Sequence, residues 1–180
     1  EARISDLQSK LDQSREQYEV LLGRTNNSTF KGQDGETQLE KQLTLMFPKA
    51  EIQDTSQTPG RGDFIMKEGG FVAMFENKNY SKNVQKSEID KFYRDLERES
   101  NSDIQCAVFV SMTTGICNRE DFCFEVVNKK PIIFIHKLKD NMASLKMAIN
   151  FFKNILSLKD LDLSDKNIIC SFKNVSGNLK

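Results

Sequence analysis

The chain has 180 residues, with 26 Lys and Arg against 26 Asp and Glu, so it carries no net charge at neutral pH. Because 38% of its residues are hydrophobic and 29% are charged, it can bury a core and is neither disordered nor collagen-like. No run approaches ~18 consecutive apolar residues, so we expect no membrane-spanning helix. Any nucleic acid would have to be bound by a local site rather than by overall electrostatic attraction.

Residues 1–22 have a heptad pattern that sets them apart from the rest of the chain. Ser14 occupies one d position, and the apolar residues at a and d positions are Ile4, Leu7, Leu11, Tyr18 and Leu21. This pattern predicts a two-stranded coiled coil and hence a homodimer. The alternative is an amphipathic helix that folds back on the core. We assign residues 23–30 to a linker and residues 31–180 to one domain.

The pattern after the linker is typical of an α/β domain. In chain order we expect a helix over 33–47, strands over 51–57, 62–67 and 71–78, a helix with Ser87 as N-cap, strands over 104–111, 122–127 and 132–135, a helix over 142–156, and a short strand over 168–172. The strand–helix–strand run over 71–111 predicts parallel pairing. The predicted fold is a mixed central sheet flanked by helices.

The cysteines and the single histidine disfavour a disulfide or zinc protein. Cys106, Cys117, Cys123 and Cys170 show no Cys-x-x-Cys spacing, so we expect free thiols in a reducing intracellular compartment, either cytoplasm or nucleus. His136 lies in an apolar strand-like run, which disfavours a zinc site and a Ser-His-Asp triad. Since the chain begins Glu-Ala-Arg-Ile, without Met or a signal segment, we expect it to be cut from a longer protein.

The most informative feature is the hairpin around residues 69–70, both glycine. A two-residue turn sets a register in which Asp63 lies directly opposite Glu76. Opposed residues point to the same face with Cβ atoms roughly 5 Å apart. Lys78, two residues after Glu76, points to that face as well. The sequence therefore brings two carboxylates and an amine together at one end of a strand pair.

Two carboxylates this close repel each other unless a cation lies between them. Mg²⁺ commonly binds one or two carboxylates together with water and substrate phosphate, so Asp63 and Glu76 predict a site for Mg²⁺ (or Mn²⁺). Lys78 is then placed to stabilise charge on a phosphate. Glu36, three residues before Leu39 on an apolar helix stripe, is a further acid for this site, acting directly or through water. The alternative is a structural ion pair between Lys78 and one of the acids.

The order and spacing of these residues resemble the PD-(D/E)XK nuclease superfamily. The similar segments are Lys31-Gly-x-x-Gly-Glu36 at the start of a helix, Gly62-Asp63-Phe, and Glu76-Asn-Lys78-Asn-Tyr. The resemblance as a whole covers roughly residues 31–136. The resemblance implies a restriction-endonuclease-like core with elements in the order α-β-β-β-α-β, and a metal-dependent nuclease activity on DNA.

Carried over by position, the resemblance implies that Asp63 and Glu76 are metal ligands, together with the backbone carbonyl of Asn77. It implies that Lys78 is the catalytic lysine and that Glu36 completes the metal site, directly or through water. The chain departs from the family name in having glycine at position 62, where that name has proline.

We therefore expect a Mg²⁺-dependent deoxyribonuclease, an endonuclease that acts on DNA as a coiled-coil dimer. The alternative is a catalytically inactive nuclease-fold scaffold, or a DNA-binding or assembly module, because one fold serves many functions. The intact acidic set favours the enzyme. The tripeptide Arg61-Gly62-Asp63 suggests integrin binding, but it runs straight into an apolar strand and is disfavoured for that reason.

Overall fold

The computed structural model describes residues 28–157, with side chains from residue 32 onward. Its elements are α2 (Ser28–Met46), β1 (Glu51–Asp54), β2 (Phe64–Glu68), β3 (Phe71–Lys78), α3 (Lys86–Leu96), η1 (Glu99–Asn101), β4 (Cys106–Ser111), β5 (Phe122–Val127), β6 (Lys130–Ile135), η2 (Leu138–Asp140) and α4 (Ala143–Ser157). The predicted coiled coil over 1–22, the predicted linker up to residue 27 and the predicted strand over 168–172 lie outside the described residues.

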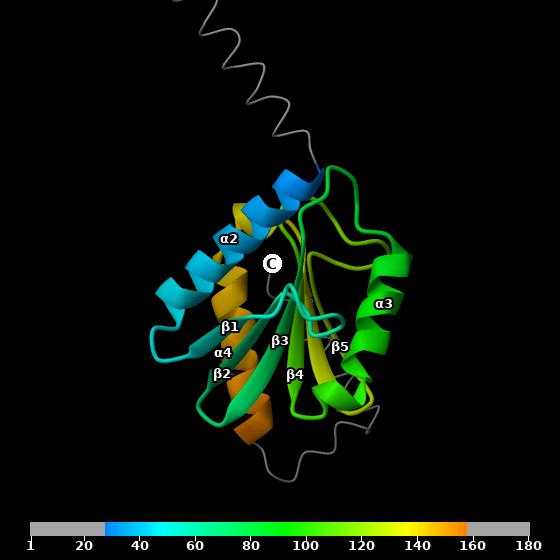
Figure 1. Cartoon of the computed structure of the whole chain (residues 1–180). Coiled ribbons are helices and arrows are strands. Elements are labelled where there is room, and N and C mark those ends of the chain that lie inside the picture. The colour runs from blue at the N-terminus through cyan, green and yellow to red at the C-terminus, as the bar shows by residue number, and fades with distance from the viewer. Residues whose placement is uncertain (1–27, 158–180) are drawn as a thin grey trace, which may run out of the picture.

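The strands form one mixed sheet of six in the order β1-β2-β3-β4-β6-β5. β3 is parallel to β4 and β4 to β6, whereas β1 and β2, β2 and β3, and β5 and β6 pair antiparallel. The parallel pairing of β3 with β4 across α3 confirms the prediction from residues 71–111. In Figure 1, α2 and α4 lie on one side of the sheet and α3 on the other. The predicted α/β class, a mixed sheet flanked by helices, is therefore confirmed.

The sheet separates two hydrophobic cores, because alternate residues of a strand face opposite sides. The larger core joins α2 and α4 to one face, and its fully buried members include Leu39, Leu43, Phe75, Val108 and Phe152. The smaller core joins α3 to the other face, and includes Met74, Ile89, Phe92, Phe109 and Phe134. Complete burial of each such side chain stabilises the fold by roughly 1.5–3 kcal/mol.

Two predicted helix starts are wrong. α2 begins at Ser28 rather than at residue 33, so it takes in residues that we assigned to the linker. α3 begins at Lys86, and its N-cap is Gln85, whose side chain makes no capping hydrogen bond. Ser87 is therefore inside the helix. The start of α3 depends on the packing of its apolar side chains against the sheet rather than on a capping side chain.

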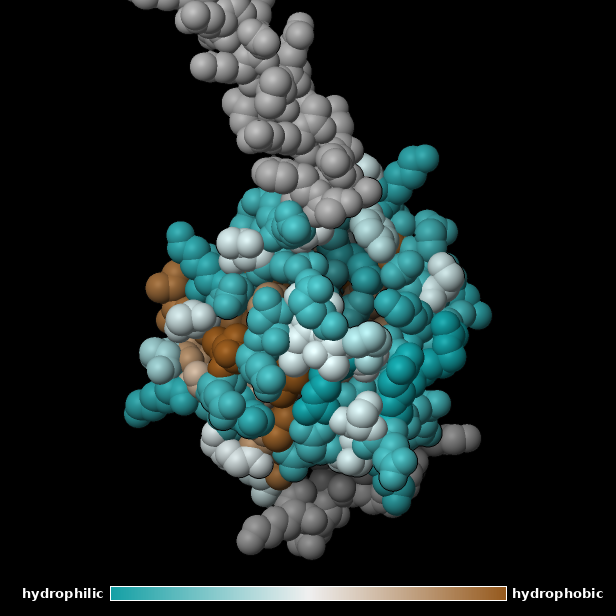
Figure 2. Space-filling model, viewed as in Figure 1, coloured by the Kyte–Doolittle hydropathy of each residue, from teal (hydrophilic) through white to brown (hydrophobic). Residues whose placement is uncertain are grey.

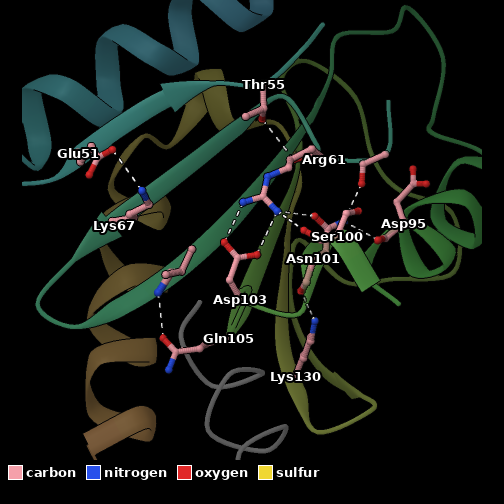
Figure 3. Close-up of polar contacts among 12 residues, drawn as sticks. Glu51, Thr55, Arg61, Lys67, Asp95, Ser100, Asn101, Asp103, Gln105 and Lys130 are labelled. Atoms are coloured by element: carbon pink, nitrogen blue, oxygen red, sulfur yellow. Dashed lines mark hydrogen bonds and ion pairs between the residues drawn. The ribbon is translucent and has the colours of Figure 1, made fainter. Parts of the chain in front are cut away.

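The connection from β1 to β2 is fixed by side-chain hydrogen bonds, so both predicted strands are shorter at this end than expected. The Thr55 hydroxyl donates to the Gly62 carbonyl at 3.1 Å. Arg61 pairs with Asp103 through two hydrogen bonds of 3.0 and 2.8 Å, and also donates to oxygens of residues 100 and 101 (Figure 3). Because Arg61 is committed to these internal contacts, the structure gives no support to integrin binding.

The fold accounts for the described cysteines and for His136. Cys106, Cys117 and Cys123 are free thiols, and burial raises the pKa of Cys106. His136 is buried after β6, where its Nε2 accepts a hydrogen bond from the Ile116 amide at 3.3 Å.

Within residues 28–157, no helix is long and apolar enough to cross a membrane. The face in Figure 2 is mainly hydrophilic, with a hydrophobic area over the side where Figure 1 places α2 and α4.

Candidate active site

The candidate site lies at the carboxyl end of β3. The β2–β3 hairpin has the predicted register, with Glu68 paired to Phe71 and Phe64 paired to Phe75. The ladder ends at that last pair, and the amide of Asp63 donates to the Phe75 carbonyl at 2.8 Å. The predicted pairing of Asp63 with Glu76 is therefore not part of the ladder, and Asp63 enters the site from the residue before β2, beside the end of β3. Figure 1 shows that α2 and α3 both begin at this end of the sheet.

Asp63 is held by the main chain of β3, since the amide of Asn77 donates to its Oδ2 at 2.6 Å. Burial, followed by the nearby charge of Glu76, raises the pKa of Asp63 from 3.8 to about 7. The hydrogen bond from Asn77 and the charge of Lys78 lower this pKa, but they are outweighed. Asp63 is thus a buried carboxylate whose charged form the protein does not fully stabilise, and a cation beside it would favour that charged form.

Lys78 and Glu76 form a buried ion pair. The distance from Lys78 Nζ to Glu76 Oε1 is 2.6 Å, and the two side chains are 13% and 11% exposed. Burial lowers the pKa of Lys78, but the charge of Glu76 and the hydrogen bond to it raise the pKa above its ordinary value. Lys78 is therefore a cation at neutral pH, so its chemistry is that of a positive charge and a hydrogen-bond donor. This pair is also what the structural alternative predicted.

Glu36 joins the site from α2. Burial raises its pKa, as do the charges of Asp54 and Glu76, whereas the charge of Lys78 lowers it. Glu36 in turn contributes to the raised pKa of Asp63. The structure therefore brings the four predicted side chains, Glu36, Asp63, Glu76 and Lys78, within electrostatic reach of one another.

Close packing of α2 against β3 sets the position of Glu36. A Cβ added at the preceding Gly35 would lie 2.8 Å from Asn77 Nδ2 and 2.8 Å from Asn79 Cβ, so a larger residue would push the helix off the sheet. The Asn77 side chain is buried under this part of α2, and among the described residues neither of its polar atoms has a hydrogen-bond partner. The predicted role of its backbone carbonyl as a metal ligand stays a prediction.

The backbone conformation at residue 62 explains why this chain has glycine where the family name has proline. Its φ is +69°, whereas proline is fixed near −65°. A Cβ at residue 62 would lie 2.7 Å from the Phe75 carbonyl oxygen and 2.7 Å from Met74 Cγ. The chain therefore needs glycine here in order to pass close to β3 and deliver Asp63 to the site.

Glu88 is a site residue that the sequence analysis missed. It lies in the first turn of α3, and its Oε2 is 3.5 Å from Lys78 Nζ. It also lies near Tyr80, whose pKa is raised by burial and by the charge of Glu88. The sequence does contain a signal for Glu88. It lies beside buried Ile89 and one turn before buried Phe92, so it is an acid at the edge of an apolar helix stripe.

The donor set can be compared with the needs of a metal ion. Among residues 28–157, no group of three or more His, Cys, Asp and Glu side chains is arranged to hold a metal. Asp63 and Glu76 supply fewer acids than such a cluster, but Mg²⁺ is commonly bound by one or two carboxylates and keeps several waters. The hard oxygen donors and the burial that disfavours the charged form of Asp63 fit a hard divalent cation of this kind.

Comparisons with known proteins do not assign the chain to a family. No protein-family model matches it, and no curated protein matches it in sequence. Because an α/β fold alone does not define a function, the function has to be inferred from the chemistry of this site.

Proposed function

We propose that the protein is a metal-dependent deoxyribonuclease built on a restriction-endonuclease-like core. The observation that carries the proposal is the meeting of Asp63, Glu76 and Lys78 at the carboxyl end of β3, with Glu36 reaching them from the first helix of the domain. The observed element order opens α-β-β-β-α-β, as in the PD-(D/E)XK superfamily that the sequence resembles.

Each site residue has a role that follows from its surroundings. When bound, Mg²⁺ or Mn²⁺ would activate a water molecule and neutralise charge on the phosphate. Asp63 and Glu76 supply hard oxygen ligands, with the Asn77 carbonyl beside them. Lys78 donates its ammonium hydrogens and stabilises the negative charge that develops as the P–O3′ bond breaks. Glu36, partly buried beside them, is placed to accept a hydrogen bond from water.

The proposed partner is DNA. Because the chain has no net charge to attract DNA over its whole surface, the DNA would be bound at the site itself. The heptads over residues 1–22 support a homodimer, in which two sites would face one duplex and favour cleavage of both strands. Free thiols among the described cysteines suit a reducing compartment inside the cell.

The competing function is that of an inactive nuclease-fold module used for DNA binding or assembly. Two observations favour it: Lys78 neutralises Glu76 without any metal, and the described residues contain no three-acid metal cluster. An ion pair of this kind can be purely structural. What distinguishes the two functions is metal binding and metal-dependent cleavage, both of which can be measured directly.

The test is cleavage of supercoiled plasmid by the full chain with Mg²⁺ or Mn²⁺. Wild type should nick or linearise the plasmid only with metal, and Lys78→Ala should abolish this activity. Lys146→Ala, which removes an exposed lysine of α4, is the matched control and should cleave as wild type does. Equal activity in wild type and Lys78→Ala would assign the cleavage to a contaminant. No cleavage together with no Mn²⁺ binding would establish the inactive module instead.

A further inference from the structure

Lys78 is held between two carboxylates that come from different elements. Glu76, on the same strand, lies 2.6 Å away, and Glu88, on α3, lies 3.5 Å away. The Lys78 side chain is 13% exposed, whereas that of Glu88 is 30% exposed. The two acids are therefore unequal: one makes a short buried contact with the ammonium, and the other makes a longer contact nearer to solvent.

Glu88 has a second neighbour besides Lys78 near the end of β3. The charge of Glu88 raises the pKa of the Tyr80 hydroxyl, and the Tyr80 carbonyl accepts a hydrogen bond from the Thr113 hydroxyl at 3.0 Å. Thr113 follows β4, and Glu88 lies in the first turn of α3. The position of the Glu88 carboxylate is therefore set by where α3 begins as well as by Lys78.

The proposed function creates a conflict at Glu76. The same carboxylate is needed by a divalent cation and by Lys78, two positive charges that compete for it. If Glu76 turned wholly to the cation, an ammonium in a largely buried position would lose its partner, and an unpaired buried charge is strongly destabilising. A second carboxylate within reach of Lys78 removes this difficulty.

We propose that Glu88 is a positioning residue that keeps Lys78 paired when Glu76 binds a divalent cation. This inference rests on the proposed function. Glu88 touches neither substrate nor metal in this scheme, and it acts only through Lys78. It therefore makes cation binding at Asp63 and Glu76 compatible with a lysine that stays in the site as a cation.

The test is a double-mutant cycle read out as Mn²⁺ affinity of the full chain, measured by calorimetry or by the electron paramagnetic resonance of free Mn²⁺. Glu88→Gln should weaken Mn²⁺ binding about tenfold in the wild-type background and less than about twofold in a Lys78→Gln background. Lys78→Gln alone should bind Mn²⁺ at least as tightly as wild type, because a competing cation is gone. Asp90→Asn, which removes an acid of α3 that pairs with Lys86, should leave the affinity unchanged.

Three results would overturn the inference. One is an affinity of Glu88→Gln equal to that of Asp90→Asn. Another is the same loss in both backgrounds, which would mean that Glu88 acts through its charge and not through Lys78. No Mn²⁺ binding by wild type would remove the proposed function and this inference with it. If Glu88→Gln does not fold, Glu88→Ala replaces it in the cycle, and wild-type affinity in that variant would overturn the inference.

Discussion

Replacing Asp63 with asparagine removes a buried carboxylate whose pKa is raised by burial and by Glu76. In the metal-free protein this pKa is about 7, against an ordinary value of 3.8. Between these two values the folded state holds a proton that the unfolded chain releases, so the stability of the fold falls as the pH rises. At about 1.4 kcal/mol per pKa unit, ionising Asp63 in the folded state costs about 4 kcal/mol.

Urea denaturation with a chelator, from about pH 4 to about pH 8, measures this cost. Wild type should lose about 4 kcal/mol of unfolding free energy relative to Asp63→Asn over that range. The variant keeps an oxygen that can accept the hydrogen bond from Asn77. Glu40→Gln, which removes an exposed carboxylate of α2, should follow wild type. The same pH dependence in wild type and Asp63→Asn would refute the raised pKa of Asp63 in the folded protein.

Three further predictions concern the scaffold around the site. Gly62→Ala should lose more than about 2 kcal/mol of stability, because residue 62 has a φ of +69° and its added Cβ would meet the backbone of β3. Gly69→Ala is the control and should lose about 1 kcal/mol, because residue 69 has a φ of +60° but open space around its Cβ. Equal losses of unfolding free energy in urea would contradict the close approach of residue 62 to β3. Arg61→Ala should cost about 1 kcal/mol because its pair with Asp103 is partly exposed, and strict additivity with Asp103→Ala would show that the pair contributes nothing. Cys106 should resist iodoacetamide in the folded protein and react in urea, as peptide mapping by mass spectrometry would show, and rapid labelling without urea would contradict its burial.

The sheet and the core of the site could be predicted because they depend on local signals. Gly69-Gly70 fixes a two-residue turn, and the turn fixes the register up to the pair of Phe64 and Phe75, the residues next to Asp63 and Glu76. Likewise, the continuous apolar run of β4 predicts a strand covered on both faces, and all its side chains are buried.

The remaining features depend on packing that no local signal encodes. The start of α3 at Lys86 lacks a capping side chain, so the capping rule pointed to Ser87 instead. The contact between Glu88 and Lys78 could be predicted only if the distance between α3 and the end of β3 were known. That distance is set by the volume of the side chains packed between them. The need for glycine at position 62 arises from the approach of the chain to Phe75 and Met74, which only the folded backbone reveals.

The separation of the two cores by the sheet has a consequence for partly folded forms of the protein. Glu36 is carried by α2, which packs on the larger core, and Glu88 by α3, which packs on the smaller one. Local opening events can release one packed layer while the sheet persists. Either release would leave Glu76 and Lys78 on β3, with Asp63 just before β2, but remove one of the two flanking acids. On the proposed function, a chain emerging from synthesis would then have only a weakened site until both helical layers had docked.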